Sequence, residues 1–315
     1  MNASLLQVEA LNADILRLQS TGSDISTLED ARQTVVDGIA GIVPLRQTVR
    51  ENGTISLMTT SGTNLIDGRA VQFDFDATPT ITADMTLASG ALGAVLLDGT
   101  AIGPATGIGR LDGGSLGAAF AMRDATLVDV QDGLDEIAAD LIARFQDPNN
   151  DPSLNPGDLG ILTDEGGTLD LSDIPGIAGR IALNPAVDPS LGGNVVLFRD
   201  GLNATVPGPV GNSTQLDRWI LALAETRSDL PGSAERSASG RAVEFVAQVG
   251  ATRLTAEEQL SFTAARWDTL HAAELANGVD TDLELQQLLR IEQAYAANAR
   301  VIQTADFLMQ RLMEL

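Results

Sequence analysis

The 315-residue chain contains no cysteine, and all 19 of its basic residues are arginine because lysine is absent as well. Without cysteine there is no disulfide, no thiolate nucleophile and no cysteine-based metal site. Without lysine there is no P-loop to hold a nucleotide phosphate. Aromatic residues make up only 3% of the chain, so Leu, Ile, Val and Ala must supply most of the packing, which favours helices over large β-sandwiches.

Long hydrophobic runs and positive charge are also scarce. The sequence has no stretch of about 18 apolar residues, which predicts no membrane insertion. The first residues, Met-Asn-Ala-Ser, lack the charged and apolar regions of a Sec signal peptide. With 43 acidic residues and a net charge of -24, the surface repels nucleic acid and anionic lipid, and we expect no nucleic-acid partner.

Helical periodicity is present at both ends of the chain. Apolar residues follow a 3-4 spacing from Val8 to Leu18, which predicts a first helix. A second helix is predicted from Ser26, where Ser26 and Glu29 form a capping box. Its expected apolar face consists of Leu28, Ala31, Val35 and Ile39. Later helices are expected from Ser213, around Val243 and from a cap at Thr255 and Glu258.

Between these ends the apolar pattern changes to a period of two. Asn52-Gly53 lies between two alternating runs and is the best short signal of a β-hairpin. Further strands are predicted at residues 71–75 and 81–87. A helical segment follows over residues 116–145, with a weak point near 129–133, and residues 147–210 are rich in Pro, Gly, Asn and Asp.

These patterns predict a mainly α fold with a β insertion (α+β): an elongated helical bundle with antiparallel hairpins and a long terminal coiled-coil helix. We expect bundle helices over residues 1–42, 113–146 and 213–277. Residues 43–112 form the expected β-hairpin region, and 147–212 a loop-rich excursion with short strands. Residues 278–315 form the expected C-terminal assembly helix.

Three patterns suggest chemistry, and each is incomplete. G-G-S-L-G at residues 113–117 matches a nucleophile elbow around Ser115, but the only candidate base is His271 and no strong strand precedes the motif. Residues 147–158 resemble an EF-hand loop, with Pro152 and Asp158 where the pattern requires Gly and Glu. G-I-G at residues 107–109 lacks the third glycine of a dinucleotide fingerprint, because Asp112 stands there.

We therefore expect no enzyme, no cofactor and no metal site. A secreted calcium-binding surface protein, using the loop at residues 147–158, is kept as the alternative function.

The last helix carries the strongest pattern. Apolar residues recur in steps of three and four from Leu288 to Leu312, with one polar position at Asn298, and a second stripe runs beside them at intervals of seven. About 35 residues give a helix of roughly 50 Å, longer than a small domain is wide. The sequence predicts an assembly interface formed by Leu288, Ile291, Tyr295, Val301, Ile302, Leu308, Met309 and Leu312.

This last segment also resembles the C-terminal signature of flagellar axial proteins, through residues 278–284 and 292–306. The chain is most similar to the hook-associated protein 1 family, through L-E-D-A-R at 28–32, G-G-S-L-G at 113–117, M-R-D at 122–124, V-D-P at 187–189 and L-F-R-D-G at 197–201. Leu283 and Ile291-Glu292 depart from the commoner Glu and Tyr-Gln of the family. Members begin with a further coiled-coil segment and more bundle helices, so the resemblance implies a chain lacking that N-terminal segment.

The resemblance implies a structural protein at the hook-filament junction of the bacterial flagellum. It further implies secretion through the flagellar type III export apparatus, with assembly outside the cell. The implied partners are the hook protein, hook-associated protein 3, copies of the chain itself and a flagellar export chaperone. The terminal helices would then build the inner tube, which agrees with the apolar pattern of the last helix.

Overall fold

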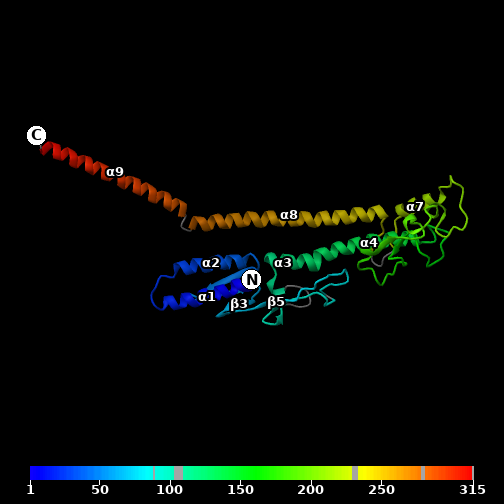
Figure 1. The fold of residues 1–315 in the computed structure, drawn as a ribbon, viewed down its shortest axis with the longest axis horizontal. Helices are drawn as coiled ribbons and strands as arrows, with labels where there is room; N and C mark the ends of the chain where they lie inside the picture. The colour runs from blue at the N-terminus through cyan, green and yellow to red at the C-terminus, as the bar shows by residue number, and fades with distance from the viewer. Residues whose placement is uncertain (88, 103–108, 229–232, 278–280, 314–315) are drawn as a thin grey trace. The chain divides into compact units, whose positions relative to one another are not determined.

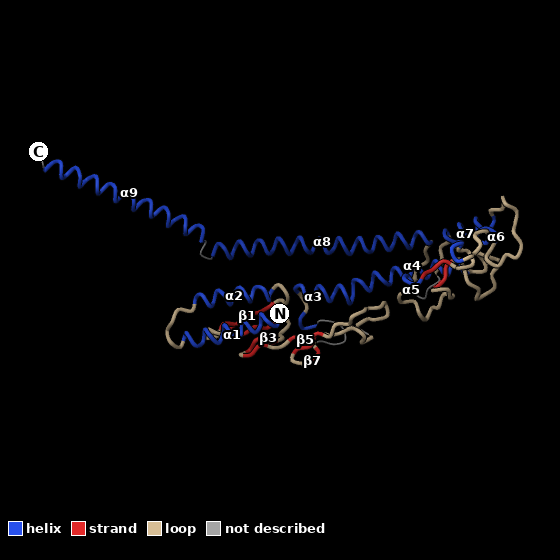
Figure 2. The backbone as a smooth tube through the Cα atoms, in the orientation of Figure 1, coloured by secondary structure: helices blue, strands red, loops and turns tan. Residues whose placement is uncertain are grey.

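The computed structural model describes residues 1–87, 89–102, 109–228, 233–277 and 281–313. Over these residues helices predominate and the strands are short and antiparallel, so the predicted mainly α fold with a β insertion is confirmed. The chain divides into two compact units, Met1–Val246 and Ala247–Leu315. Figure 1 follows the elements along the chain, and Figure 2 separates helices from strands by colour.

The first two helices, α1 (Asn2–Gln19) and α2 (Ser26–Ala40), share one core with the first sheet. The face predicted for α1 is confirmed in part: Val8 and Ile15 are buried, together with Leu5 and Asn12, whereas Leu11 and Leu18 are half-buried. The face predicted for α2 is partly wrong, since Ala31 is exposed while Arg32 and Val36 are buried.

A buried polar contact explains the changed face of α2. The Arg32 guanidinium donates to Asn12 Oδ1 at 3.0 Å and to the Gly53 carbonyl at 2.7 Å. Asn12 in turn holds the backbone of Ile55 through both of its side-chain atoms. Loss of water around Arg32 lowers the pKa of its guanidinium. These bonds attach α1, α2 and the sheet to one another.

The capping box predicted at the start of α2 does not form. Asp24 precedes the helix, and its Oδ1 accepts from Ser26 N at 3.0 Å and from Ser26 Oγ at 2.5 Å. Ser26 is therefore already part of the helix, and the first donors are satisfied by a residue two positions earlier.

The first sheet is antiparallel, in the order β1 (Leu45–Val49), β2 (Ile55–Thr59), β3 (Asn64–Asp67) and β4 (Arg69–Ala70). The hairpin predicted at Asn52-Gly53 is confirmed, with Val49 opposite Ile55. Gly53 has a φ of +72°, which a residue with a side chain rarely adopts. Alternate residues of β2 are buried, as the period of two predicts.

The second sheet contains β5 (Phe73–Phe75), β6 (Val95–Leu97) and β7 (Thr100–Ala101). The strand predicted at residues 81–87 is wrong, since these residues form turns and Ile81 is exposed. Thr82 donates to Asp84, and the Met85 N–H donates back to the Thr82 carbonyl. Such local bonds compete with strand pairing.

The next helical segment consists of a short helix η1 (Gly109–Leu111), α3 (Gly114–Ala121), a π-helical turn η2 (Met122–Thr126) and α4 (Leu127–Gln146). The weak point predicted near residues 129–133 is misplaced, because α4 is continuous there and the irregular turn is η2. Arg123 in η2 forms an ion pair with Asp124 and donates to the Gly93 carbonyl at 3.1 Å, so the turn anchors the neighbouring loop.

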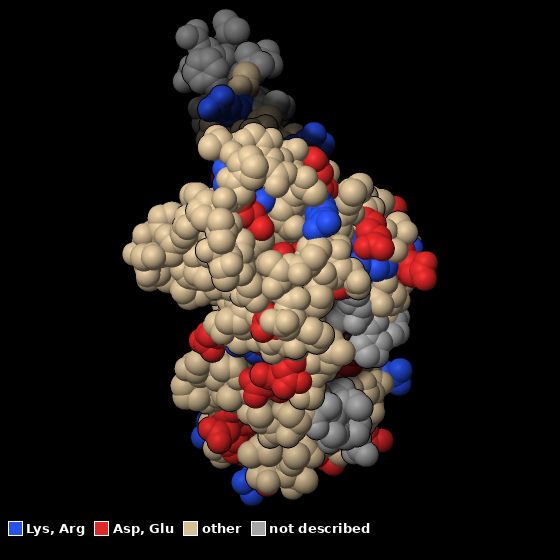
Figure 3. All heavy atoms as spheres, turned by 90° about the vertical axis from the view of Figure 1, so that its right-hand side faces the viewer, with Lys and Arg blue, Asp and Glu red and all other residues tan. Residues whose placement is uncertain are grey.

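After α4 the chain is mostly loops with short elements. They are β8 (Leu162–Asp164), α5 (Ile177–Arg180), β9 (Ile181–Leu183), η3 (Pro189–Leu191), α6 (Leu197–Asp200) and α7 (Thr214–Ala224). Phe145 of α4 packs against Trp219 of α7, whose Nε1 donates to the Phe198 carbonyl. Figure 3 views the molecule from the side on which α7 lies, where acidic side chains are dispersed among uncharged ones.

The last two helices are α8 (Ala238–Asn277) and α9 (Thr281–Met313). The separate helix predicted from a cap at Thr255 and Glu258 is wrong, because α8 is continuous through both residues. The Thr255 hydroxyl donates to the Ala251 carbonyl at 3.0 Å, four residues earlier, so it does not cap a helix.

Acid should weaken this fold through its hydrogen-bonded carboxylates. The pKa of Asp200 is lowered from its ordinary 3.8 by hydrogen bonds from Arg199 and from the Gly208 N–H. A lowered folded-state pKa contributes stability that is present above 3.8 and is lost as the pH falls below it. Thermal unfolding between pH 7 and pH 2.5 should show a melting temperature falling at the acid end, and falling less in Asp200→Asn. Parallel curves for the two proteins would contradict this assignment.

Candidate assembly interface

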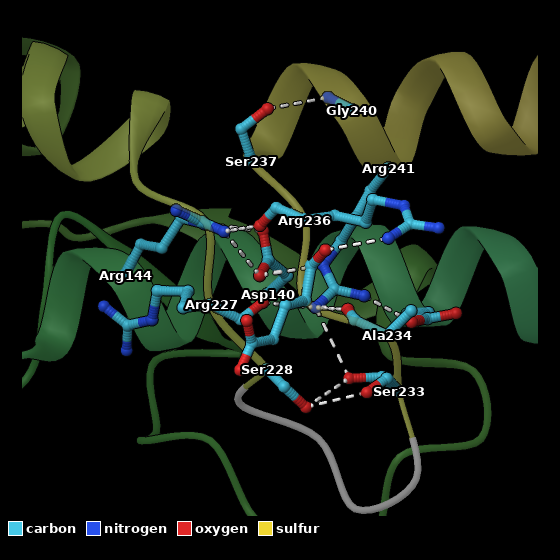
Figure 4. Close-up of polar contacts among 12 residues, drawn as sticks. Asp140, Arg144, Arg227, Ser228, Ser233, Ala234, Arg236, Ser237, Gly240 and Arg241 are labelled. Atoms are coloured by element: carbon cyan, nitrogen blue, oxygen red, sulfur yellow. Dashed lines mark hydrogen bonds and ion pairs between the residues drawn. The ribbon is translucent and has the colours of Figure 1, made fainter.

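The start of α8 is packed inside unit 1, and this anchors the helix. Arg241 in its first turn is buried and lies 3.0 Å from Asp140 of α4, as an ion pair outside hydrogen-bonding geometry. One turn later Phe245 contacts α4 at Gly133, where an added Cβ would lie 2.7 Å from Phe245 Cδ2. Figure 4 shows the polar part of this contact.

Beyond this anchor α8 exposes large apolar side chains, and several of them lie on one side of the helix. Val246, Leu260, Trp267 and Leu270 are each at least 60% exposed. Their spacing of 14, 7 and 3 places them on one side of the helix. The sequence predicts bundle helices over this stretch, and the predicted assembly interface does not include it. The sequence did contain a signal for this surface, because its apolar residues have the same heptad spacing that predicted the interface on α9.

Three of the residues predicted to form the assembly interface lie on α9 with described side chains. Leu288, Ile291 and Tyr295 are 66%, 68% and 78% exposed. Their spacing of three and four places them on the same face of the helix. The side chains of Val301, Ile302, Leu308, Met309 and Leu312 lie outside the described residues.

The exposed faces of α8 and α9 are the main candidate site. Isolated helices are marginal in water, and most helix stability in proteins comes from burial of an apolar face. Each Leu or Ile side chain that becomes fully buried contributes about 1.5–3 kcal/mol. The large apolar side chains exposed on the described part of α9 therefore form a candidate interaction surface.

The nucleophile-elbow motif is structural in this fold. The Ser115 and Leu116 N–H groups, in the first turn of α3, donate to the carbonyls of Gly41 and Ile42 at 3.1 Å. They are therefore engaged and do not form an oxyanion hole. His271 stacks on Trp267, with ring centroids 4.8 Å apart, and lies 3.7 Å from Glu274.

The carboxylates of the loop at residues 147–158 are likewise engaged in hydrogen bonds, within the loop and to residues 202 and 203. Asp151 accepts from Ser153 and from the Leu202 N–H at 2.9 Å. Asp158 accepts from Asn155 and Asn203, which lowers the pKa of its carboxyl. The described residues contain no group of three or more acidic or histidine side chains that could hold a metal ion. The calcium-binding alternative thus has no supporting ligand cluster here.

The dinucleotide-like G-I-G motif is described only at its last residue. Residues 107 and 108 of the dinucleotide-like G-I-G lie outside the described residues, and the third residue, Gly109, begins η1.

Among the described helices, none has the length and apolar character needed to cross a membrane.

Comparisons with known proteins identify the family. The family model for the flagellar hook-associated protein FlgK helical domain matches residues 1–155. The model for the C-terminal region of the flagellar basal body rod FlgEFG proteins matches residues 276–315. No curated protein matches the chain.

One similar solved structure is that of the flagellar hook junction protein FlgK from Burkholderia pseudomallei, with 22% sequence identity and a TM-score of 0.35. The match covers 51% of this chain and 30% of that one, so the matched part spans less than a third of the length of that relative. The assignment depends on the two family models, which match both end regions of the sequence. The chain belongs to the flagellar hook-associated protein family, a family of structural components of the bacterial flagellum.

Proposed function

We propose that the chain is a structural subunit that joins the hook to the filament of the bacterial flagellum, and that it assembles through the apolar face of α9. The observation that supports this most directly is the exposure of Leu288, Ile291 and Tyr295 along one face of that helix. In the proposal this face also includes Val301, Ile302, Leu308, Met309 and Leu312. Residues 278–315 then form the assembly helix, and residues 1–42, 113–146 and 213–277 supply the bundle helices.

The proposed partners are copies of the chain, the hook protein, hook-associated protein 3 and a flagellar export chaperone. The chaperone would cover the apolar face of α9 before assembly, because a helix of this kind is prone to associate with other apolar surfaces. Export through the type III apparatus requires an unfolded chain. The absence of cysteine suits this route, because no disulfide can form before export.

A cysteine placed on α9 tests the interface. Because the chain has no cysteine, Tyr295→Cys provides a unique thiol on the apolar face and Gln293→Cys a matched thiol on the opposite side of the helix. We expect a maleimide to label both variants in the purified chain. In intact flagella the Tyr295→Cys thiol should be labelled at least tenfold less, because assembly covers it.

Two results would contradict the proposal, one for the interface and one for the location in the flagellum. Equal labelling of Tyr295→Cys in the purified chain and in intact flagella would show that this face does not form the interface. Antibody label on flagella at a position other than the hook-filament junction, in electron micrographs, would show that the proposed location is wrong.

A further inference from the structure

Two arginines and one aspartate meet in the interior of unit 1, where α4 contacts the start of α8 (Figure 4). Arg144 donates to both oxygens of Asp140, with distances of 2.7 Å from Nε and 3.1 Å from Nη2. Arg241 lies 3.0 Å from Asp140 Oδ1 and forms a second ion pair with Glu136. The side chains of Asp140, Arg144 and Arg241 are 1%, 0% and 3% exposed. We call these three residues the arginine-aspartate cluster.

The cluster also holds the connection between α7 and α8. Arg144 and Arg241 together donate to five backbone carbonyls: that of Ala222 in the last turn of α7, and those of Glu225, Arg227, Ala234 and Arg236 in the connection. Within the connection, the backbones of Arg227 and Arg236 pair in an antiparallel bridge, with both N–H···O distances at 3.1 Å. Both ends of the connection are therefore attached to α4.

Stability alone gives a weak account of this cluster. Burial takes the charges out of water, and apolar residues of similar volume often stabilise a fold as well as a buried ion pair does. Apolar contacts do not fix the direction of a chain segment. Hydrogen bonds do, because they weaken steeply when their geometry changes. The planar guanidinium presents its donors at fixed angles, so five held carbonyls define the path of the connection.

We infer that the arginine-aspartate cluster is a rigid joint that sets the direction of residues Ala238–Val246 of α8 relative to α4. Asp140 orients both arginines, and the arginines hold the carbonyls before α8. The contact between Phe245 and Gly133 one turn later supplies a second fixed point. A force applied along Ala238–Val246 would then pass into α4, because the held carbonyls fix the residues before α8. This inference does not depend on where the protein assembles.

The test measures the direction of residues Ala238–Val246 relative to α4 separately from the stability of the fold. Spin labels are attached through Asp132→Cys on α4 and Val243→Cys on α8, both exposed positions in unit 1 of a chain with no other cysteine. Pulsed electron resonance then gives the distribution of distances between the labels. The test variants are Asp140→Asn and the apolar triple variant Asp140→Leu, Arg144→Met, Arg241→Met. The control is Arg253→Gln, which breaks an exposed ion pair of the same helix with Glu257.

We expect a narrow distribution in the parent and in Arg253→Gln, and a distribution at least twice as wide in both test variants. Because apolar residues can fill the buried space, the triple variant should keep a melting temperature within a few degrees of the parent while it loses the fixed direction. A triple variant with the parent's narrow distribution would overturn the inference, since packing alone would then set the direction.

If Asp140→Asn does not fold, Arg241→Lys replaces it. Lysine keeps the charge but loses the forked donors to Arg227 and Ala234, so a wider distribution is again expected. An unchanged width in Arg241→Lys and in the triple variant would exclude the joint.

Discussion

Ile291→Asp should reduce incorporation of the chain into flagella by about 100-fold or more. The side chain is 68% exposed in the chain itself, so the aspartate is tolerated before assembly. In the proposed interface the substitution removes about 3 kcal/mol of apolar burial and adds a charge that must leave water. A loss of 3 kcal/mol corresponds to roughly 100-fold in an equilibrium constant. The measurement is the amount of the variant recovered with purified flagella, relative to the amount exported.

The matched control is Gln293→Asp, which introduces the same charge on the opposite side of α9. It should be incorporated within a few-fold of the parent. Unit 1 should be unaffected in both variants, with unchanged unfolding of its own cores. If Ile291→Asp and Gln293→Asp were incorporated equally, the apolar face of α9 would not be the surface on which assembly depends.

Gly114→Ala should destabilise unit 1 by about 3 kcal/mol, from overpacking of about 1–3 kcal/mol and a left-handed backbone penalty of about 1 kcal/mol. Gly114 has a φ of +63°, and an added Cβ would lie 2.4 Å from the Ile42 carbonyl oxygen. Because the atom in the way is backbone, the strain cannot be relieved by a rotamer change. Urea unfolding followed by circular dichroism measures the effect.

Two further substitutions separate the causes. Gly62 has a φ of +88° with nothing within 4 Å of an added Cβ, so Gly62→Ala should cost only about 1 kcal/mol. Ser115→Ala, at the position of the supposed nucleophile, should change stability by less than about 0.5 kcal/mol. Equal effects of Gly114→Ala and Gly62→Ala would contradict the close approach of α3 to Ile42.

The predictions that succeeded rest on short-range chemistry. The hairpin at Asn52-Gly53 follows from the backbone freedom of Gly53, and the face of α1 follows from a 3-4 spacing over 18 residues. The strand and the capping box failed as predictions because polar side chains there form local hydrogen bonds that the pattern of apolar residues does not show. Thr82 donates to Asp84 in a segment that forms turns where a strand was predicted, and Ser26 bonds to Asp24 and does not cap the helix.

Buried charge was the part of the fold that the sequence did not reveal. Arg32, Arg144 and Arg241 are each 5% exposed or less, although arginine is usually a surface residue. Each of them has at least one partner far along the chain: Arg144, besides its bonds to Asp140 one turn away, donates to a carbonyl 92 residues away, at Arg236. A periodic pattern reports only neighbours within a few turns, so contacts of this range appear only once the chain has folded.

The sequence by itself determined the helical character, the hairpin, the family and the apolar pattern of the last helix, because each depends on residues close together in the chain or on motifs of fixed spacing. The tertiary structure alone decided that α8 is one continuous helix anchored at Arg241. It also decided that the motif around Ser115 and the loop at residues 147–158 are engaged in hydrogen bonds with distant parts of the chain. The physical reason is that burial and hydrogen-bond partners are properties of packed elements. The sequence does not show whether an arginine, a serine or an aspartate will be surrounded by water or by the carbonyls of a distant loop.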